Sequence, residues 1–372
     1  MAAGRGALEA CFCVLICPLT VASRISPLKI AHDFRTFNVM KIGNLNIEQG
    51  ILLAPMEDVT DHPFRVICKR LGADIVYTEF VNSEGLVRGS KKTRTKMEFE
   101  EEERPLAIQI YGGEVSSMAG AAQLAESFHP DFIDINCGCW VKDVALRGAG
   151  AGLLRDLPRM EQIARTVVDA VSLPVTLKTR LGWDAKTIRI VDVAKMCEQA
   201  GIQALAIHCR TRDQGHKGPV DYSWIPKIKE AVAIPIIVNG DIVTPQQAKA
   251  VFDRTGCDAI MLGRGAVSNP WIFQQVKHYM RTGELLPEAT IGERVDLLRE
   301  HLKLSVAYKG ERAGVIELRK HYSGFLRGLP HVSKIRMELM QFTEAEPILE
   351  HLTRFLELYS PGGTQSDSAA AA

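Results

Sequence analysis

The sequence contains one thiol whose setting suits chemistry. Cys139 lies in the segment DINCGCWVKDV, three residues after Asn136. A thiol in such a loop can donate a proton to a carbanion or an enolate, or can attack as a nucleophile. A free cysteine is more often a small buried apolar group, and Cys137, two residues earlier, is an internal rival. We expect no metal here, because a C-x-C pair without further ligands is a poor zinc site.

Other polar residues stand where short apolar runs end. Lys178, in VTLKTR, could hold a positive charge beside a developing anion, such as the pyrimidine side of a reduced flavin. Gln109, in LAIQI, could hydrogen-bond a planar imide ring, and His208 ends a further run. Less specific interpretations are also open. Lys178 could be a surface lysine, Gln109 a polar residue that fills the mouth of a barrel, and His208 a structural histidine.

Two turns that contain glycine suit a phosphate group. Asn239, Gly240 and Asp241 follow one apolar run, and Gly263 and Arg264 follow the next. Glycine lets backbone N–H groups approach phosphate oxygens, and an arginine adds a fork of donors. Asn-Gly-Asp by itself could be an ordinary turn. The two turns together favour a cofactor that bears a phosphate.

These residues need a fold that brings the ends of the runs together. Eight short apolar runs alternate with helical stretches between residues 50 and 275: 51–54, 74–80, 106–110, 132–136, 175–178, 204–208, 235–239 and 258–262. This alternation predicts an α/β fold, a (β/α)₈ TIM barrel, whose active site lies at the carboxyl ends of the strands. The alternative is an open doubly wound sheet, but the first run is followed by APMEDVTD and not by GxGxxG.

Composition and length give the organisation of the chain. The 372 residues are 46% hydrophobic and 24% charged with a net charge of +1, which excludes a disordered, collagen-like or coiled-coil chain. We predict an N-terminal extension over 1–39, a barrel over 40–285, a helical domain over 286–358 and a disordered tail over 359–372. The apolar stretch 11–22 resembles a secretion signal, but we favour a start site placed too early, with Met40 as the true start.

Location and cysteine chemistry follow from the same counts. No apolar run reaches the roughly 18–20 residues of a membrane span. Nine cysteines without a C-x-x-C pair suit a reducing cytosol, so we expect a cytoplasmic protein. We also expect that it does not bind membranes and that it is a monomer.

The predicted helical domain carries local basic charge. Helices are expected over 292–307, 313–326 and 345–358, with Gly328-Leu-Pro330 as a break. Between Lys303 and Arg336, eight basic residues stand against two acidic ones, which leaves a net charge of +6. Histidine and aromatic side chains are interleaved. The pattern indicates a surface for a phosphate backbone with stacking groups, and its alternative is a solvated helix face.

Seven segments resemble the tRNA-dihydrouridine synthases, and most of all the bacterial B-type enzymes. They are LAPMEDVTDHPFR, YTEFVNSEGL, DINCGC, VTLKTRLGW, AIHCRTR, NGDI and MLGRGA, in order within residues 40–355. The resemblance implies FMN-dependent reduction of uridines in tRNA to 5,6-dihydrouridine, with NADPH or NADH as reductant. It implies hydride transfer from flavin N5 to C6 of a flipped-out uracil, and protonation of C5 by Cys139.

The resemblance also implies site residues. Those matching FMN contacts are Ala54, Pro55, Met56, Gln109, Lys178, His208, Asn239, Gly240, Asp241, Gly263 and Arg264. Asn136 and Arg180 match positions near the uracil. We add Arg210, Arg319, Lys320 and Arg327 as residues that bind the tRNA.

One residue departs from the family pattern. The family usually has proline directly after this cysteine, and here the residue is Trp140. Because proline fixes φ near about −65°, we expect Trp140 to free the loop and to reduce turnover of tRNA while flavin binding survives. Two other functions remain open: an FMN-barrel reductase of a small pyrimidine or enone, and an RNA-binding protein whose catalysis is impaired by Trp140. A secreted protein is a further alternative, based on the N-terminal stretch alone.

Overall fold

The computed structural model describes residues 39–329 and 331–359. The predicted start at Met40 therefore lies within it, whereas the expectations for residues 1–38 and for 360–372 lie outside the described residues. No helix among those described is long and apolar enough to cross a membrane.

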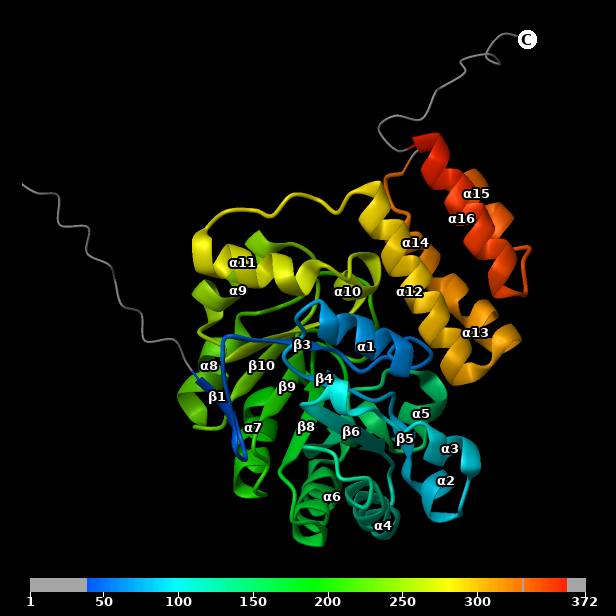
Figure 1. Ribbon diagram of the computed structural model, residues 1–372. Coiled ribbons are helices and arrows are strands. Elements are labelled where there is room, and N and C mark those ends of the chain that lie inside the picture. The colour runs from blue at the N-terminus through cyan, green and yellow to red at the C-terminus, as the bar shows by residue number, and fades with distance from the viewer. Residues whose placement is uncertain (1–38, 330, 360–372) are drawn as a thin grey trace, which may run out of the picture. The chain divides into compact units, whose positions relative to one another are not determined.

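Eight parallel strands form a barrel, as the alternation of runs predicts (Figure 1). They are β3 (Gly50–Leu53), β4 (Val76–Tyr77), β6 (Leu106–Tyr111), β7 (Phe132–Cys137), β8 (Val175–Arg180), β9 (Leu205–His208), β10 (Ile236–Asn239) and β11 (Ala259–Leu262). From β4 to β11 each strand of the barrel pairs with the next one along the chain, and β11 pairs with β3. The seam between β3 and β4 is closed by two backbone hydrogen bonds, from Leu53 N–H to Ile75 O at 3.0 Å and from Asp74 N–H to Ile51 O at 2.9 Å. The short β5 (Val81–Asn82) pairs with the end of β6.

Helices follow the strands. They are α1 (His62–Arg70), α2 (Ser83–Val87), α3 (Lys91–Thr95), α4 (Val115–Glu126), α5 (Lys142–Leu146), α6 (Leu157–Ala170), α7 (Ile190–Gln199), α8 (Trp224–Ala231), α9 (Pro245–Thr255), α10 (Arg264–Ser268) and α11 (Ile272–Thr282). Side-chain caps define several starts: Asp61 accepts from Phe64 N–H at α1, and Thr244 accepts from Gln247 N–H at α9, with proline in the first turn of both.

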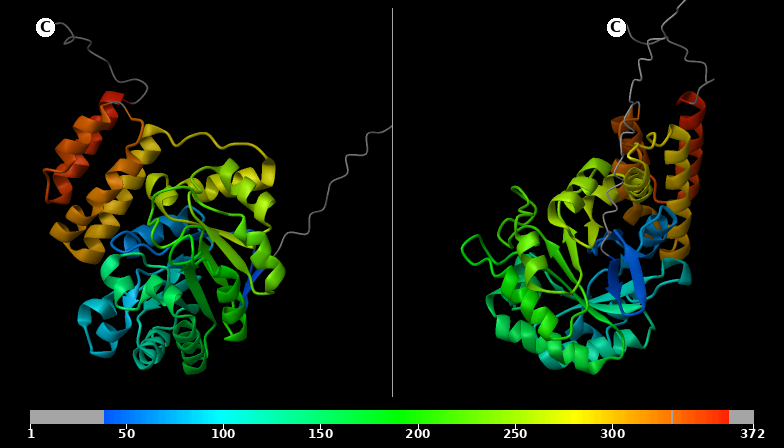
Figure 2. Two further views of the ribbon diagram at one scale, coloured as in Figure 1. Left: turned by 180° about the vertical axis from the view of Figure 1, so that it is seen from behind. Right: turned by 90° about the vertical axis from the view of Figure 1, so that its left-hand side faces the viewer.

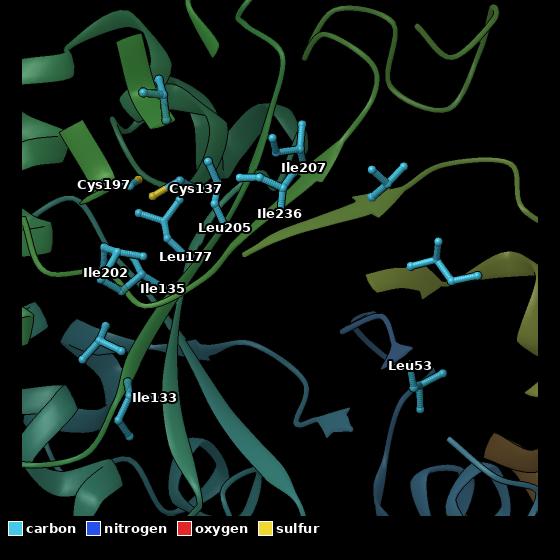
Figure 3. Close-up of a cluster of buried hydrophobic side chains, with 14 of the residues drawn as sticks. Leu53, Ile133, Ile135, Cys137, Leu177, Cys197, Ile202, Leu205, Ile207 and Ile236 are labelled. Atoms are coloured by element: carbon cyan, nitrogen blue, oxygen red, sulfur yellow. The ribbon is translucent and has the colours of Figure 1, made fainter. Parts of the chain in front are cut away.

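Alternate residues of each strand face opposite sides of the barrel wall. Leu53, Ile133, Ile135 and Leu177 belong to the apolar cluster between strands and helices, part of which Figure 3 shows. The intervening residues point into the barrel, because successive side chains of a strand alternate. The inner apolar cluster contains Leu52, Tyr77, Ala107, Phe132, Ala206, Ile237 and Met261. Above it, nearer the carboxyl ends, the inward residues are polar: Gln109, Asp134, Asn136, Thr176, Lys178, His208 and Asn239.

A hairpin that was not predicted precedes the barrel. Strands β1 (Val39–Ile42) and β2 (Leu45–Glu48) pair antiparallel. Met40 and Ile42 are each 1% exposed and join the inner apolar cluster. The hairpin thus supplies apolar side chains to the inner cluster, and the polar layer remains at the opposite, carboxyl ends of the strands.

The C-terminal region is helical, as expected, and has its own apolar core (Figure 2). Its helices are α12 (Ile291–Lys309), α13 (Glu311–Leu318), α14 (Tyr322–Phe325), α15 (Val332–Leu339) and α16 (Ala345–Tyr359). The helix expected over 313–326 is interrupted by a 3₁₀ turn at Arg319–His321, and α15 was not predicted. The boundary predicted at 285/286 falls between α11 and α12. Helix α12 packs against α1 of the barrel.

Candidate active site

A cavity of about 840 Å³ opens among the carboxyl ends of the barrel strands. It lies where a barrel enzyme has its active site. The residues expected from the sequence that line it are Ala54, Pro55, Met56, Asn136, Cys139, Lys178, Arg180, His208, Asn239, Gly240, Asp241, Gly263 and Arg264. Gln109 and Arg210 are buried beside the cavity and do not line it.

Hydrogen bonds hold the loop that carries Cys139. They involve the backbone N–H and C=O groups of both Gly138 and Cys139. Asn136 Oδ1 accepts from the N–H groups of Gly138 at 3.0 Å and of Cys139 at 2.9 Å. Arg180 Nε donates to Gly138 O at 2.9 Å, and Ala151 N–H donates to Cys139 O at 3.0 Å. The expectation that Trp140 would free this loop is therefore wrong, because none of these bonds involves residue 140.

The thiol of Cys139 stays protonated at neutral pH. Burial raises its pKa above the ordinary value, and the positive charge of Arg180 offsets this only in part. Cys139 is partly exposed to the cavity, whereas the other five described free cysteines, Cys137 among them, are buried. Of the two rivals in the DINCGC segment, Cys139 is the one that can meet a ligand in the cavity, as a proton donor and not as a thiolate.

Burial lowers the pKa of two basic side chains inside the barrel mouth, Lys178 and His208. Burial and the nearby Arg180 lower the pKa of Lys178 to about 8. Its Nζ donates to Asn239 Oδ1 at 3.2 Å, which leaves further N–H donors on the ammonium. Burial and the same arginine lower the pKa of His208 far below its usual value, so this ring is neutral. The pair can donate hydrogen bonds to an electron-rich ligand, and the lysine can gain charge when that ligand is an anion.

The two glycine-containing turns meet at one side of the cavity. Asp241 accepts from Arg210 Nη1 at 3.0 Å and from Arg264 Nη2 at 2.6 Å, and these bonds lower the pKa of its carboxyl. The side chain of Asp241 therefore orients two arginines, of which Arg264 is 56% exposed in the cavity. Gly240 has a φ of +133°, and a Cβ there would lie 2.8 Å from Val220. Glycine is required at this turn by backbone conformation as well as by close packing.

The side-chain amide of Gln109 forms hydrogen bonds with two neighbouring residues inside the barrel. Its Nε2 donates to Asp134 Oδ2 at 2.6 Å and its Oε1 accepts from Asn136 Nδ2 at 2.8 Å. Sequence reasoning missed Asp134, which is 1% exposed. The clue was present, because Asp134 and Asn136 are two residues apart on one strand and so face the same side.

Trp140 is fixed at the rim of the cavity. Its Nε1 donates to Nε2 of His216 at 3.1 Å, and its ring lies over Gly215, whose missing Cβ would be 3.2 Å away. Burial and nearby Arg180 lower the pKa of His216 to about 4, so it can accept this bond as a neutral ring. His216 was not predicted, since it lies in a loop without a motif.

A family model described as dihydrouridine synthase (Dus) matches residues 52–359. The chain belongs to the dihydrouridine synthase family. It is 41% identical over 327 residues to "tRNA-dihydrouridine synthase B" of Pseudomonas aeruginosa, covering 88% of this chain and 98% of that protein. It is 40% identical over 318 residues to the protein of the same name from Vibrio vulnificus, covering 86% and 99%. The resemblance seen in the seven sequence segments is confirmed.

The fold of this dihydrouridine synthase also matches a more distant solved structure. It is described as "Crystal structure of TcOYE with pHBA", with a TM-score of 0.50 and 11% identity, over 64% of this chain and 91% of that one. At this identity the likeness concerns the barrel fold alone.

The basic residues of the helical region of this dihydrouridine synthase fall into two groups. Arg319 Nη2 donates to Phe342 O at 2.9 Å, and Lys320 Nζ donates to Asp58 O, so both are held in contacts within the protein. Between Lys303 and Arg336, the exposed basic residues for which the structure shows no ion pair are Lys303, Arg312, Arg327, Lys334 and Arg336. Of the four residues expected to bind tRNA, Arg210, Arg319, Lys320 and Arg327, the last alone is exposed.

Proposed function

We propose that this chain reduces uridines in tRNA to 5,6-dihydrouridine, with bound FMN as cofactor and NADPH or NADH as reductant. The observation that carries the proposal is a protonated thiol, Cys139, held in place in a cavity that also contains Lys178 and His208. Family membership supports the reaction, and the relatives' printed names point to tRNA.

The residues of the cavity fit FMN. Its volume of about 840 Å³ is in the range of cofactor sites. Arg264 offers free guanidinium donors beside Gly240 and Gly263, which suits a phosphate. Lys178 and His208 offer donors to the oxygens and nitrogens of a pyrimidine ring. The reduced flavin supplies hydride at its N5, and the protein supplies orientation and charge.

Lys178 and Cys139 have distinct roles in this proposal. The ammonium of Lys178 stabilises negative charge on a ring beside it, and this is strongest in a buried site. The thiol of Cys139 donates its proton to C5 of a uracil that carries negative charge after hydride addition at C6. A raised thiol pKa keeps the proton available, and the enolate is basic enough to take it. Asn136 holds the thiol's loop in position through two N–H bonds.

The uracil must leave its stack to reach this cavity, because the target atoms are inaccessible inside folded RNA. The exposed cations Lys303, Arg312, Arg327, Lys334 and Arg336 provide a surface for the RNA backbone. A reductase of a small pyrimidine would not need this surface.

The test uses the full chain. We expect oxidised-flavin absorption bands in the purified protein and dihydrouridine in unmodified tRNA after addition of NADPH. Cys139→Ala should keep the bands and lose product, and Cys137→Ala is the matched control, because that thiol is buried on the outer face of β7. A protein that cannot be loaded with FMN contradicts the proposal. Equal turnover of free uridine and tRNA would support the small-pyrimidine reductase instead.

A further inference from the structure

A buried chain of hydrogen bonds leads from Asp134 to the backbone of Cys139. Asp134 Oδ2 accepts from Gln109 Nε2 at 2.6 Å, and Gln109 Oε1 accepts from Asn136 Nδ2 at 2.8 Å. Asn136 Oδ1 accepts from the N–H groups of Gly138 and Cys139. Asp134 does not line the cavity, yet three successive bonds connect it to the loop of the thiol.

Each hydrogen bond in this series determines the orientation of the next side-chain amide. An ionised carboxylate only accepts, so Asp134 turns the NH₂ group of Gln109 toward itself and the Gln109 oxygen toward Asn136. That oxygen in turn selects the NH₂ side of Asn136 and leaves Asn136 Oδ1 for the two loop N–H groups. If either amide were reversed, an NH₂ group would face the N–H groups of Gly138 and Cys139 and their bonds would be lost.

The state of Asp134 agrees with this arrangement. Burial raises its pKa to about 6, while bonds from Thr176 and Gln109 and the charge of Lys178 oppose the rise. It is therefore a carboxylate at neutral pH. Thr176 Oγ1 donates to the other oxygen, Oδ1, at 2.5 Å, so both carboxylate oxygens are occupied and the group has one orientation.

We infer that Asp134 is a positioning residue, which orients Cys139 through Gln109 and Asn136 without touching the thiol or the substrate. The catalytic importance of this positioning rests on the proposed function of Cys139. The positioning itself does not, since it concerns the backbone of the loop and can be measured without tRNA.

Three substitutions separate positioning from a general effect on folding. Asp134→Leu has a similar volume and removes the acceptor for Gln109. Asp134→Asn can keep that acceptor, because its NH₂ group can donate to the Thr176 hydroxyl, which also accepts. Thr176→Val is the matched control: it removes the bond to Asp134 Oδ1 and leaves the bond from Gln109 intact.

The first readout is the rate at which iodoacetamide alkylates Cys139 in the full-length protein, located by peptide mass spectrometry. We expect Asp134→Leu to raise this rate by about fivefold, because a released loop exposes the thiol. Asp134→Asn and Thr176→Val should stay within about twofold of the unaltered protein. The second readout is kinetic: in Asp134→Leu, NADPH should reduce bound flavin at the usual rate, while tRNA should reoxidise it more slowly.

The outcomes distinguish the possible failures. An unchanged alkylation rate in Asp134→Leu, or an equal rise in Thr176→Val, overturns the inference. An equal rise in Asp134→Asn also overturns it, because the charge and not the bond would then matter. If Asp134→Leu does not fold, Gln109→Met removes the middle link and must raise the rate in the same way. If the unaltered protein makes no dihydrouridine but the alkylation pattern holds, the proposed function fails and the positioning role stands.

Discussion

Lys309, at the end of α12, donates to Oδ2 of Asp61 at 2.5 Å, while Oδ1 of the same carboxylate caps the first turn of α1. One buried side chain thus begins a helix of the barrel and binds the helical region that follows it. Lys309 also pairs with Glu317, so the bond belongs to a small network at the contact between α1 and α12.

This pair predicts an acid-sensitive stability. Burial alone would raise the pKa of Asp61, but the charges of Lys309 and His301 outweigh this effect. The pKa of the carboxyl is therefore lowered from 3.8 to about 2. Because the folded pKa is the lower one, the stabilisation is complete above about pH 4 and is lost as pH falls toward about 2. The shift corresponds to about 2 kcal/mol. Asp61→Asn keeps the cap, lacks this acid step and should be less stable by about that amount in urea denaturation at neutral pH.

The matched variant for the cap is Asp61→Ala. It should cost about 1 kcal/mol more than Asp61→Asn, since the bond to Phe64 N–H is lost as well. Equal stability of the two variants would show that the cap contributes nothing. An acid step of unchanged size in Asp61→Asn would assign it to another group.

A second prediction concerns the phosphate of FMN. Arg264→Ala should weaken FMN binding by about tenfold, a modest value because the guanidinium is 56% exposed. Riboflavin, which lacks the phosphate, should bind both proteins equally. Fluorescence titration measures both affinities, and Arg281→Ala, an exposed arginine at the end of α11, is the control. An equal loss for FMN and riboflavin would argue against a phosphate contact at Arg264.

Much of the architecture could be predicted from the sequence, because it follows from local patterns. The eight apolar runs coincide with β3, β4 and β6 to β11, since parallel strands covered on both faces are continuously apolar. The hairpin β1–β2 was missed because four-residue strands with alternating burial carry little signal. Helix α15 was missed because Gly328 and Pro330 were taken to interrupt the whole segment.

The cavity shows a different limit of sequence reasoning. The positions at the strand ends indicated which residues could lie close together. They did not indicate which of these side chains would form hydrogen bonds with other residues of the protein instead of with a ligand. Gln109 and Asp241 were expected at FMN, and the structure engages the first with Asp134 and the second with two arginines. Such pairings join residues that lie 23 to 31 positions apart, and no local pattern encodes them.

A third prediction uses the titration of Lys178. Burial lowers its pKa to about 8, so the ammonium form is lost as pH rises past that value unless an anion holds the proton. We expect FMN affinity to fall between about pH 7 and pH 9. Lys178→Met, which keeps the apolar stem without the charge, should lower the affinity at pH 7 by about tenfold and remove the pH dependence. An identical pH dependence in both proteins would show that another group titrates.

The last prediction concerns Trp140, where the family usually has proline. The four bonds that hold the backbone of Gly138 and Cys139 do not involve residue 140, so the loop does not need a proline to fix it. We therefore expect Trp140→Pro to change the rate of dihydrouridine formation at saturating tRNA by less than about threefold.

Trp140→Phe is the matched control for the indole. It keeps a ring over Gly215 and loses only the Nε1 bond to His216, so its effect should be equally small. Both variants should retain the flavin spectrum and the alkylation rate of Cys139. A tenfold or greater increase in the rate of dihydrouridine formation in Trp140→Pro, with no change in Trp140→Phe, would contradict this expectation. It would mean that the backbone conformation at residue 140 misplaces the Cys139 thiol. The chain would then be an RNA-binding protein with impaired catalysis.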